Sequence, residues 1–143
     1  MTNSTEINVF DQVEAALHQL PVNIEREYEI AAGARIDFRV TTKQGNVLIV
    51  EVKTAQSGYL AVSSWGQLVM YKKLMQEWKN VKDVTPVIIT NLKIAPDLGE
   101  MLRNSGMVVV ELGSAEKMAK SLKDQLEKIG VHLDHFSVGK EGN

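Results

Sequence analysis

The chain has 143 residues, of which 44% are hydrophobic and 24% charged, with a formal net charge of −2 and a pI near 5.9. This balance excludes a wholly disordered chain, and the mild acidity argues against a basic nucleic-acid coat. Because there is no cysteine, neither a disulfide framework nor thiolate ligation of zinc or an iron–sulfur cluster is available. The polar start and the lack of a long apolar run predict a cytoplasmic protein without a membrane span.

Hydrophobic periodicity predicts four helices and five strands in one domain that covers residues 1–143. The expected helices are 7–20, from Ser63 or Ser64 to about Lys79 or Asn80, about 95–104 and 114–129, and the expected strands are 24–31, 34–41, 46–54, 85–90 and 107–112. Segment 55–62 is expected to be a loop, and 130–143 a tail. Early strands joined by short turns predict an antiparallel meander, and later strands separated by helices predict parallel pairing. The fold class is therefore α/β, with a mixed sheet of about five strands flanked by helices in the order αβββαβαβα.

The turn between the second and third strands decides which side chains face one another. A two-residue turn at Gln44-Gly45 would leave Asp37 and Glu51 on opposite faces. A three-residue loop, Lys43-Gln44-Gly45, places glycine at a left-handed position and sets Asp37 opposite Glu51. We favour the second geometry, because it gathers Asp37, Glu51 and Lys53 and pairs the apolar residues of both strands on the other face. The alternation within residues 34–41 itself predicts that Ala34, Ile36, Phe38 and Val40 share one face of their strand.

Three further features can each be accounted for by ordinary structure. Glu51 and Lys53 lie two apart on one apolar strand and could be a surface ion pair. Glu14 falls within the apolar arc of the first helix, where a slight roll would bring it to the edge. Gln67 and Tyr71 are spaced i, i+4 on the helix after the third strand, where Tyr71 could line the rim of the core. The order and spacing of all these residues together form a more demanding combination.

In that combination the sequence resembles the PD-(D/E)XK nuclease superfamily, and within it the RecB-like branch with a Gln-x-x-x-Tyr helix. The resemblance covers residues 7–112 and implies a restriction-endonuclease-like core, followed by the helix at 114–129. The proline of the superfamily name is missing before Asp37, where the chain reads Ala34-Arg35-Ile36. By position, Asp37 matches the motif aspartate, Glu51 and Lys53 match the E-x-K pair, and Glu14 matches the first-helix glutamate.

The resemblance implies a magnesium-dependent deoxyribonuclease, with Mn²⁺ as a substitute and DNA as the partner. Its catalytic residues would be Asp37, Glu51, Lys53 and Glu14, and its metal ligands Asp37, Glu51, Glu14 and the Val52 backbone carbonyl. Lys53 would assist the attacking water or stabilise developing charge. Substrate contacts are expected from Gln67, Tyr71, Arg35, Lys72 and Tyr59. Arg35 and Arg39 have a second expectation, namely ion pairs with the glutamates of the neighbouring strand.

Two other functions remain open at this stage. A nuclease-fold module that binds nucleic acid or a protein without catalysis is the main alternative, and a structural domain with a coincidental E-x-K pair is the other. Within the nuclease hypothesis we favour a repair- or phage-type enzyme. The resemblance leaves open a homodimer, a helicase or modification subunit, association with the nucleoid and a phage origin.

Overall fold

The computed structural model describes residues 2–54, 59–91 and 93–133, which form four helices and five strands. The helices are α1 (Thr2–Leu17), α2 (Tyr59–Trp78), α3 (Pro96–Asn104) and α4 (Ala115–Lys128). The strands are β1 (Val22–Ala31), β2 (Ala34–Thr42), β3 (Val47–Lys53), β4 (Val84–Thr90) and β5 (Val108–Glu111). The order αβββαβαβα confirms the predicted fold class.

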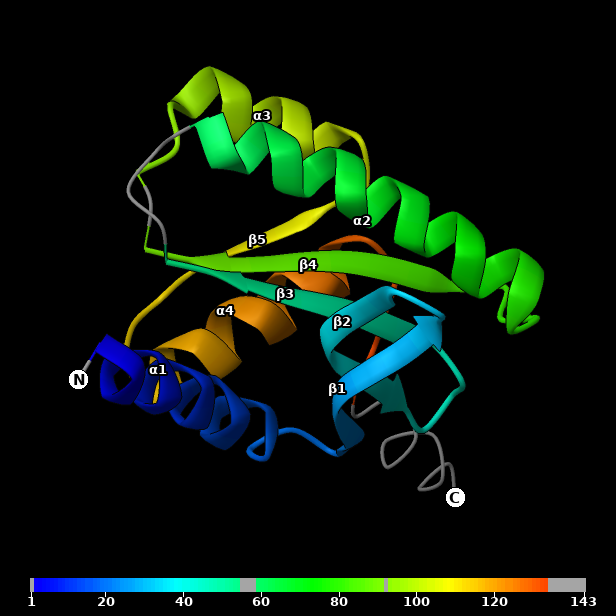
Figure 1. Cartoon of the computed structure of the whole chain (residues 1–143), viewed down its shortest axis with the longest axis horizontal. Coiled ribbons are helices and arrows are strands. Elements are labelled where there is room, and N and C mark those ends of the chain that lie inside the picture. The colour runs from blue at the N-terminus through cyan, green and yellow to red at the C-terminus, as the bar shows by residue number, and fades with distance from the viewer. Residues whose placement is uncertain (1, 55–58, 92, 134–143) are drawn as a thin grey trace.

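The five strands form one mixed sheet in the order β1-β2-β3-β4-β5. The first three strands are antiparallel, whereas β3, β4 and β5 are parallel, as the lengths of their connections predict. Helices α1 and α4 cover one face of the sheet, and α2 and α3 cover the other (Figure 1). The carboxyl ends of the three parallel strands therefore meet at one edge of the molecule, at the left of Figure 1.

The hairpin between β2 and β3 has the three-residue loop favoured above. Thr42 donates its N–H to the carbonyl of Asn46 at 2.9 Å, and Gly45 has a φ of +93°. Glycine adopts this left-handed conformation without steric cost. The observed pairs, which include Phe38 with Val50 and Thr41 with Val47, are those of the predicted register.

Strand β2 does not keep its apolar side chains on one face, so the prediction of a single apolar face is wrong. Phe38 packs in the core beneath α1 and α4, whereas Ile36 packs in the core beneath α2. The β1–β2 ribbon coils strongly at this point, and Glu27 of β1, between the paired positions Arg26 and Tyr28, has a φ of +54°. Asp37 lies at the crossing between the two cores.

Helix α2 begins at Tyr59, four residues before the predicted serine cap. The prediction that Tyr59 lies in a loop is therefore wrong, while residues 55–58 of that predicted loop lie outside the described residues. The sequence Tyr59-Leu60-Ala61-Val62 contains no glycine or proline, so nothing in it prevents the helix from extending back towards Gly58.

Strand β5 is an edge of the sheet, and α4 covers its exposed backbone. Gln125 donates to the Val109 carbonyl at 2.7 Å and accepts from the Val109 N–H at 3.3 Å, as a neighbouring strand would. This contact shields an edge that could otherwise pair with another chain. It also places Gln125 level with the middle of β5. In the part of the chain that the structure describes, no helix is long and apolar enough to cross a membrane.

Candidate active site

Asp37 and Glu51 meet where strands β2 and β3 separate. The last regular pair of the ladder is Phe38 with Val50, and Asp37 and Glu51 are the next residues beyond it on the two strands. Beyond it, the side chains replace the backbone bonds: Asp37 N–H donates to Glu51 Oε2 at 3.0 Å, and Val52 N–H donates to Asp37 Oδ2 at 2.7 Å. These reciprocal bonds hold both carboxylates in one place and leave Asp37 Oδ1 and Glu51 Oε1 outside the backbone contacts.

Burial makes the ionised forms of these two acids costly. Glu51 is 4% exposed, in a strand whose preceding residues are all buried. Loss of hydration, followed by repulsion from Asp37, raises the pKa of Glu51 to about 7. Burial also raises the pKa of Asp37, against the opposing effects of the Val52 N–H and the Lys53 charge. Ionisation of both acids together is therefore costly, and a bound cation would stabilise the doubly ionised pair.

Lys53 supplies the nearest cation to the carboxylate pair. Its Nζ lies 3.6 Å from Glu51 Oε1, and its side chain is 30% exposed. Glu51 and Lys53 share the α2 side of β3, because their neighbours Val50 and Val52 pack on the opposite face. The structure thus brings together three of the residues that the sequence analysis selects, namely Asp37, Glu51 and Lys53.

Gln67 and Tyr71 interact with each other on α2. Gln67 Nε2 donates to the Tyr71 hydroxyl at 2.9 Å, as the i, i+4 spacing allows. Tyr71 is 8% exposed and belongs to the core between the sheet and α2, whereas Gln67 is exposed. The pair therefore presents one exposed amide that the buried tyrosine orients, on the same side of the sheet as Glu51.

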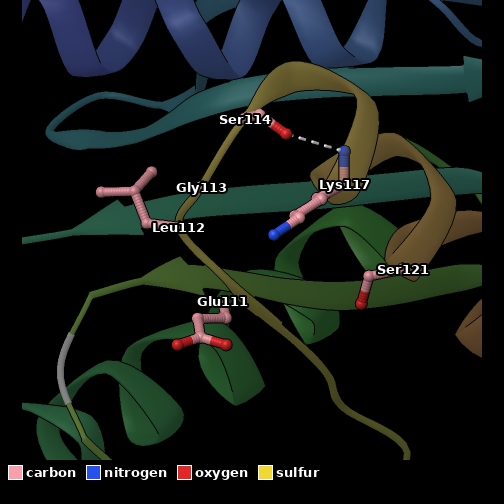
Figure 2. Close-up of a pocket in the computed structure, with 6 residues that line it drawn as sticks. All are labelled: Glu111, Leu112, Gly113, Ser114, Lys117 and Ser121. Atoms are coloured by element: carbon pink, nitrogen blue, oxygen red, sulfur yellow. Dashed lines mark hydrogen bonds between the residues drawn. The ribbon is translucent and has the colours of Figure 1, made fainter.

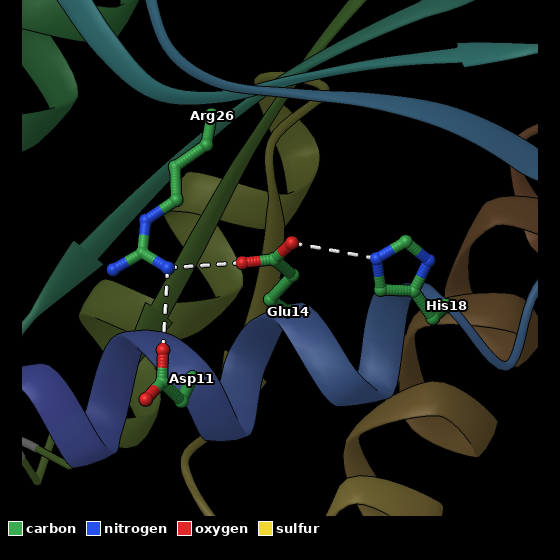
Figure 3. Close-up of polar contacts among 4 residues, drawn as sticks. All are labelled: Asp11, Glu14, His18 and Arg26. Carbon is green, nitrogen blue, oxygen red and sulfur yellow. Dashed lines mark hydrogen bonds and ion pairs between the residues drawn. The ribbon is translucent and has the colours of Figure 1, made fainter.

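Glu14 lies in a different set of contacts (Figure 3). Its Oε1 accepts from Arg26 Nη1 at 2.9 Å, and its Oε2 lies 3.4 Å from His18 Nε2. The same Arg26 nitrogen contacts Asp11 at 3.2 Å. The guanidinium also lies over the rings of Phe10 and Phe38, which are 5.4 and 5.9 Å away. Glu14 thus occupies the edge of the apolar face of α1, where its partner is an arginine.

No group of three or more acidic or histidine side chains that could hold a metal occurs among the residues that the structure describes. The sequence-predicted metal set of Asp37, Glu51 and Glu14 is therefore not assembled in this arrangement. Asp37 and Glu51 are together, but Glu14 is bonded to Arg26. Arg26 connects the two places electrostatically, because its charge opposes to a small extent the burial that raises the pKa of Asp37.

The remaining predicted substrate contacts lie around this site without joining it directly. Arg35 is exposed and lies 3.9 Å from Glu27, and Arg39 Nε lies 3.7 Å from Glu25, so both arginines have the expected ion pairs. Arg39 also donates to the Tyr28 hydroxyl at 2.8 Å. Lys72 is half-buried on α2. Tyr59 is the first residue of that helix, and its side chain lies outside the described part of the structure.

Three residues near the site were not predicted from the sequence. Arg26, the partner of Glu14, has no distinguishing signal within the alternating charges of β1. Thr90 and Glu111 end β4 and β5, and the register places Thr90 beside Lys53 and Glu111 beside Thr90. The rule that ligands bind at the carboxyl ends of parallel strands would have selected these two positions.

Comparison with known proteins gives a family match. Residues 17–129 match the family model described as the C-terminal domain of endonuclease NucS. This match includes Asp37, Glu51, Lys53 and the Gln67–Tyr71 pair. No curated protein matches the chain significantly.

Two solved structures share the fold. A repair endonuclease from Pyrococcus abyssi is 18% identical with a TM-score of 0.56, over 80% of this chain and 47% of that one. EndoMS in a complex with double-stranded DNA is 14% identical with a TM-score of 0.53, over 80% of this chain and 45% of that one. The chain therefore spans less than half the length of either structure. These similarities confirm the predicted mixed sheet flanked by helices.

Proposed function

Because the chain belongs to the family defined by the C-terminal domain of endonuclease NucS, we propose that it is a metal-dependent nuclease that hydrolyses phosphodiester bonds in DNA. The observation that carries this proposal is the reciprocal bonding of Asp37 and Glu51 beside Lys53. A buried and a half-buried carboxylate, both with raised pKa values and an adjacent cation, at the point where two strands separate, are typical of a functional site.

The donor set fits Mg²⁺ or Mn²⁺. The donors are hard oxygens, and Mg²⁺ is commonly held by one or two carboxylates while it keeps several waters. The Val52 carbonyl adds a third oxygen, because the N–H of that residue points between β2 and β3 and its C=O points to the same side. Asp37, Glu51 and the Val52 carbonyl are therefore the proposed ligands. A bound divalent ion would supply a Lewis acid that acidifies a water and offsets phosphate charge.

The other residues of the site have proposed roles that follow from their positions. The partly exposed ammonium of Lys53 would donate to a phosphate oxygen or to the attacking water. Gln67, oriented by Tyr71, would contact the phosphate backbone, which is the role that the Gln-x-x-x-Tyr branch implies. Lys72, Arg35 and Tyr59 remain proposed outer contacts of the substrate.

Glu14 has a different proposed role, as a positioning residue that acts through Arg26. We expect Glu14→Gln to leave the Mg²⁺ concentration for half-maximal thermal stabilisation within about threefold of wild type, because a surface ion pair contributes little. Asp37→Asn should remove the stabilisation altogether, since it removes a ligand. Thermal melts over a Mg²⁺ series check both variants. If Glu14→Gln behaved as Asp37→Asn does, Glu14 would be a metal ligand.

A cleavage panel tests the proposed function. The 143-residue chain is incubated with end-labelled linear, covalently closed circular and four-way DNA, each with Mg²⁺, Mn²⁺ or EDTA. We expect cleavage with either cation and none in EDTA, and cleavage of circles would identify an endonuclease. Binding of DNA without cleavage of any form under any condition would overturn the proposal in favour of the non-catalytic module.

A further inference from the structure

The carboxyl ends of the parallel strands carry a row of polar residues that begins at Lys53. The register places Lys53 beside Thr90 and Thr90 beside Glu111, and all three lie on the α2 and α3 side of the sheet. Neighbouring strands are about 4.8 Å apart, so Glu111 lies about 10 Å from Lys53 along this edge. The row thus leads from the proposed active site towards β5.

Two adjoining cavities open at the far end of this row. One, of about 410 Å³, is lined by residues of the loop after β5 and the start of α4, including Ser114 and Lys117. The other, of about 460 Å³, lies between β4, α3 and α4, and Lys93 and Arg103 line it. Glu111 and Ser121 line both cavities, so the two adjoin, and together they are called the groove below.

The groove has a local excess of positive charge on a chain whose net charge is −2. Lys93, Arg103 and Lys117 line it against one carboxylate, Glu111. None of these four takes part in the ion pairs between described residues, in contrast to Lys120, which pairs with Asp124 at 3.0 Å. Three exposed cations that form no ion pair with another described residue favour the binding of an anion from another molecule.

The side chains are arranged so that the cations reach the groove. Figure 2 shows Lys117 extending over the first cavity while the Glu111 carboxylate points away from it. At the second cavity, the Arg103 guanidinium lies beside Gly99, one turn earlier on α3, where the glycine has no side chain to displace it. A Cβ at Gly99 would lie 3.3 Å from Arg103 Nη1.

We propose that this groove, defined by Lys93, Arg103 and Lys117, binds the phosphate backbone of the DNA strand beyond the scissile bond. The inference rests on the proposed nuclease function, because the row from Lys53 to Glu111 joins the groove to that site. At a rise of about 3.4 Å per nucleotide in duplex DNA, about 10 Å corresponds to about three nucleotides. Glu111 lines both cavities, so its negative charge opposes phosphate binding even though its carboxylate points away from the first cavity.

Fluorescence anisotropy of a labelled DNA duplex, measured in EDTA over a salt series, tests this proposal without requiring cleavage. We expect Lys93→Ala/Lys117→Ala to weaken binding at low salt at least about tenfold and to reduce the slope of log affinity against log salt by about 2. Glu111→Gln should strengthen binding about threefold, since it removes a repulsion at an exposed site. A gain in affinity cannot result from a folding defect, so this variant keeps the test decisive.

The matched control is Lys82→Ala/Lys128→Ala. Both lysines are exposed and line neither cavity. Lys82 precedes β4, and Lys128 follows Gln125 on α4, so both lie towards the amino ends of the strands. The control should keep wild-type affinity within about twofold. Equal loss in both double variants, or weaker binding by Glu111→Gln, would overturn the proposal.

Two further outcomes distinguish a DNA-binding groove from a site for acidic protein and from the nuclease function itself. If the double variant lost affinity for a poly-glutamate peptide but not for DNA, the groove would be an acidic-protein site and the proposal would be wrong. If wild type bound DNA through Lys93 and Lys117 but cleaved none, the groove would stand and the nuclease function would fail. If wild type cleaved DNA but Lys93→Ala/Lys117→Ala bound DNA as tightly as wild type, the nuclease function would stand and the groove proposal would fail.

Discussion

Asp37→Asn is expected to reduce Mg²⁺-dependent DNA cleavage about a hundred- to a thousandfold, the loss typical when a preorganised electrostatic group is removed from an active site. The reason is that asparagine keeps an oxygen to accept from the Val52 N–H but loses the charge that a divalent ion requires. Lys53→Ala should cause a loss of similar size. Initial rates on end-labelled duplex DNA measure the effect.

The fold of the Asp37→Asn variant should be intact, because the change removes a half-buried charge without removing the hydrogen bond from the Val52 N–H. Its free energy of unfolding in EDTA should equal or exceed that of wild type. Asp83→Asn is the matched control, since Asp83 is exposed before β4, at the amino end of that strand. If the control lost as much activity as Asp37→Asn, or if Asp37→Asn kept full activity, the assignment of Asp37 would be wrong.

Glu51→Gln should make the metal-free protein more stable at pH 8 by about 2–3 kcal/mol. In the folded state burial raises the pKa of Glu51 from 4.5 to about 7. The free energy of unfolding that depends on Glu51 is therefore highest below pH 4.5, where the carboxyl is protonated. It falls as the pH rises and is lost once the pH has passed 7, where Glu51 is ionised even in the folded chain. Glutamine can still accept from the Asp37 N–H but carries no charge at any pH. Urea unfolding in EDTA at a series of pH values measures the difference.

The difference between wild type and Glu51→Gln should disappear near pH 4, where Glu51 is protonated in both folded and unfolded chains. Adding Mg²⁺ at pH 8 should stabilise wild type but not Glu51→Gln, because only the carboxylate can be a ligand. Glu77→Gln, on the exposed surface of α2, should match wild type under all these conditions. A Glu51→Gln variant that was less stable than wild type at pH 8 would show that the buried charge is not costly.

The Asp37–Glu51 pair was predictable because it depends only on local register. Gly45 favours a left-handed position, this position selects a three-residue loop, and the loop sets which residues of β2 and β3 lie opposite each other. The E-x-K spacing then places Lys53 on the same side of its strand. These relations involve residues close together in the chain, connected by one tight turn.

The contacts of Glu14 were not predictable in the same way. The helical periodicity placed Glu14 at the edge of the apolar face of α1, but it did not indicate which basic side chain would form an ion pair with Glu14. The contact with Arg26 depends on how α1 lies against the coiled β1–β2 ribbon, and the same coiling separates Ile36 and Phe38 into two cores. Strand coiling is a property of the packed sheet and leaves no mark in the alternation of residues.

The amino-acid sequence by itself determined the order and type of the elements, the pairing of the first strands and the meeting of Asp37, Glu51 and Lys53. These depend on side-chain periodicity and turn chemistry, which act over short stretches of chain. Only the tertiary structure decided that Glu14 pairs with Arg26 and that Lys93, Arg103 and Lys117 line one groove beyond Glu111. Those contacts join residues from separate elements, and the packing of helices on both faces of the sheet fixes them.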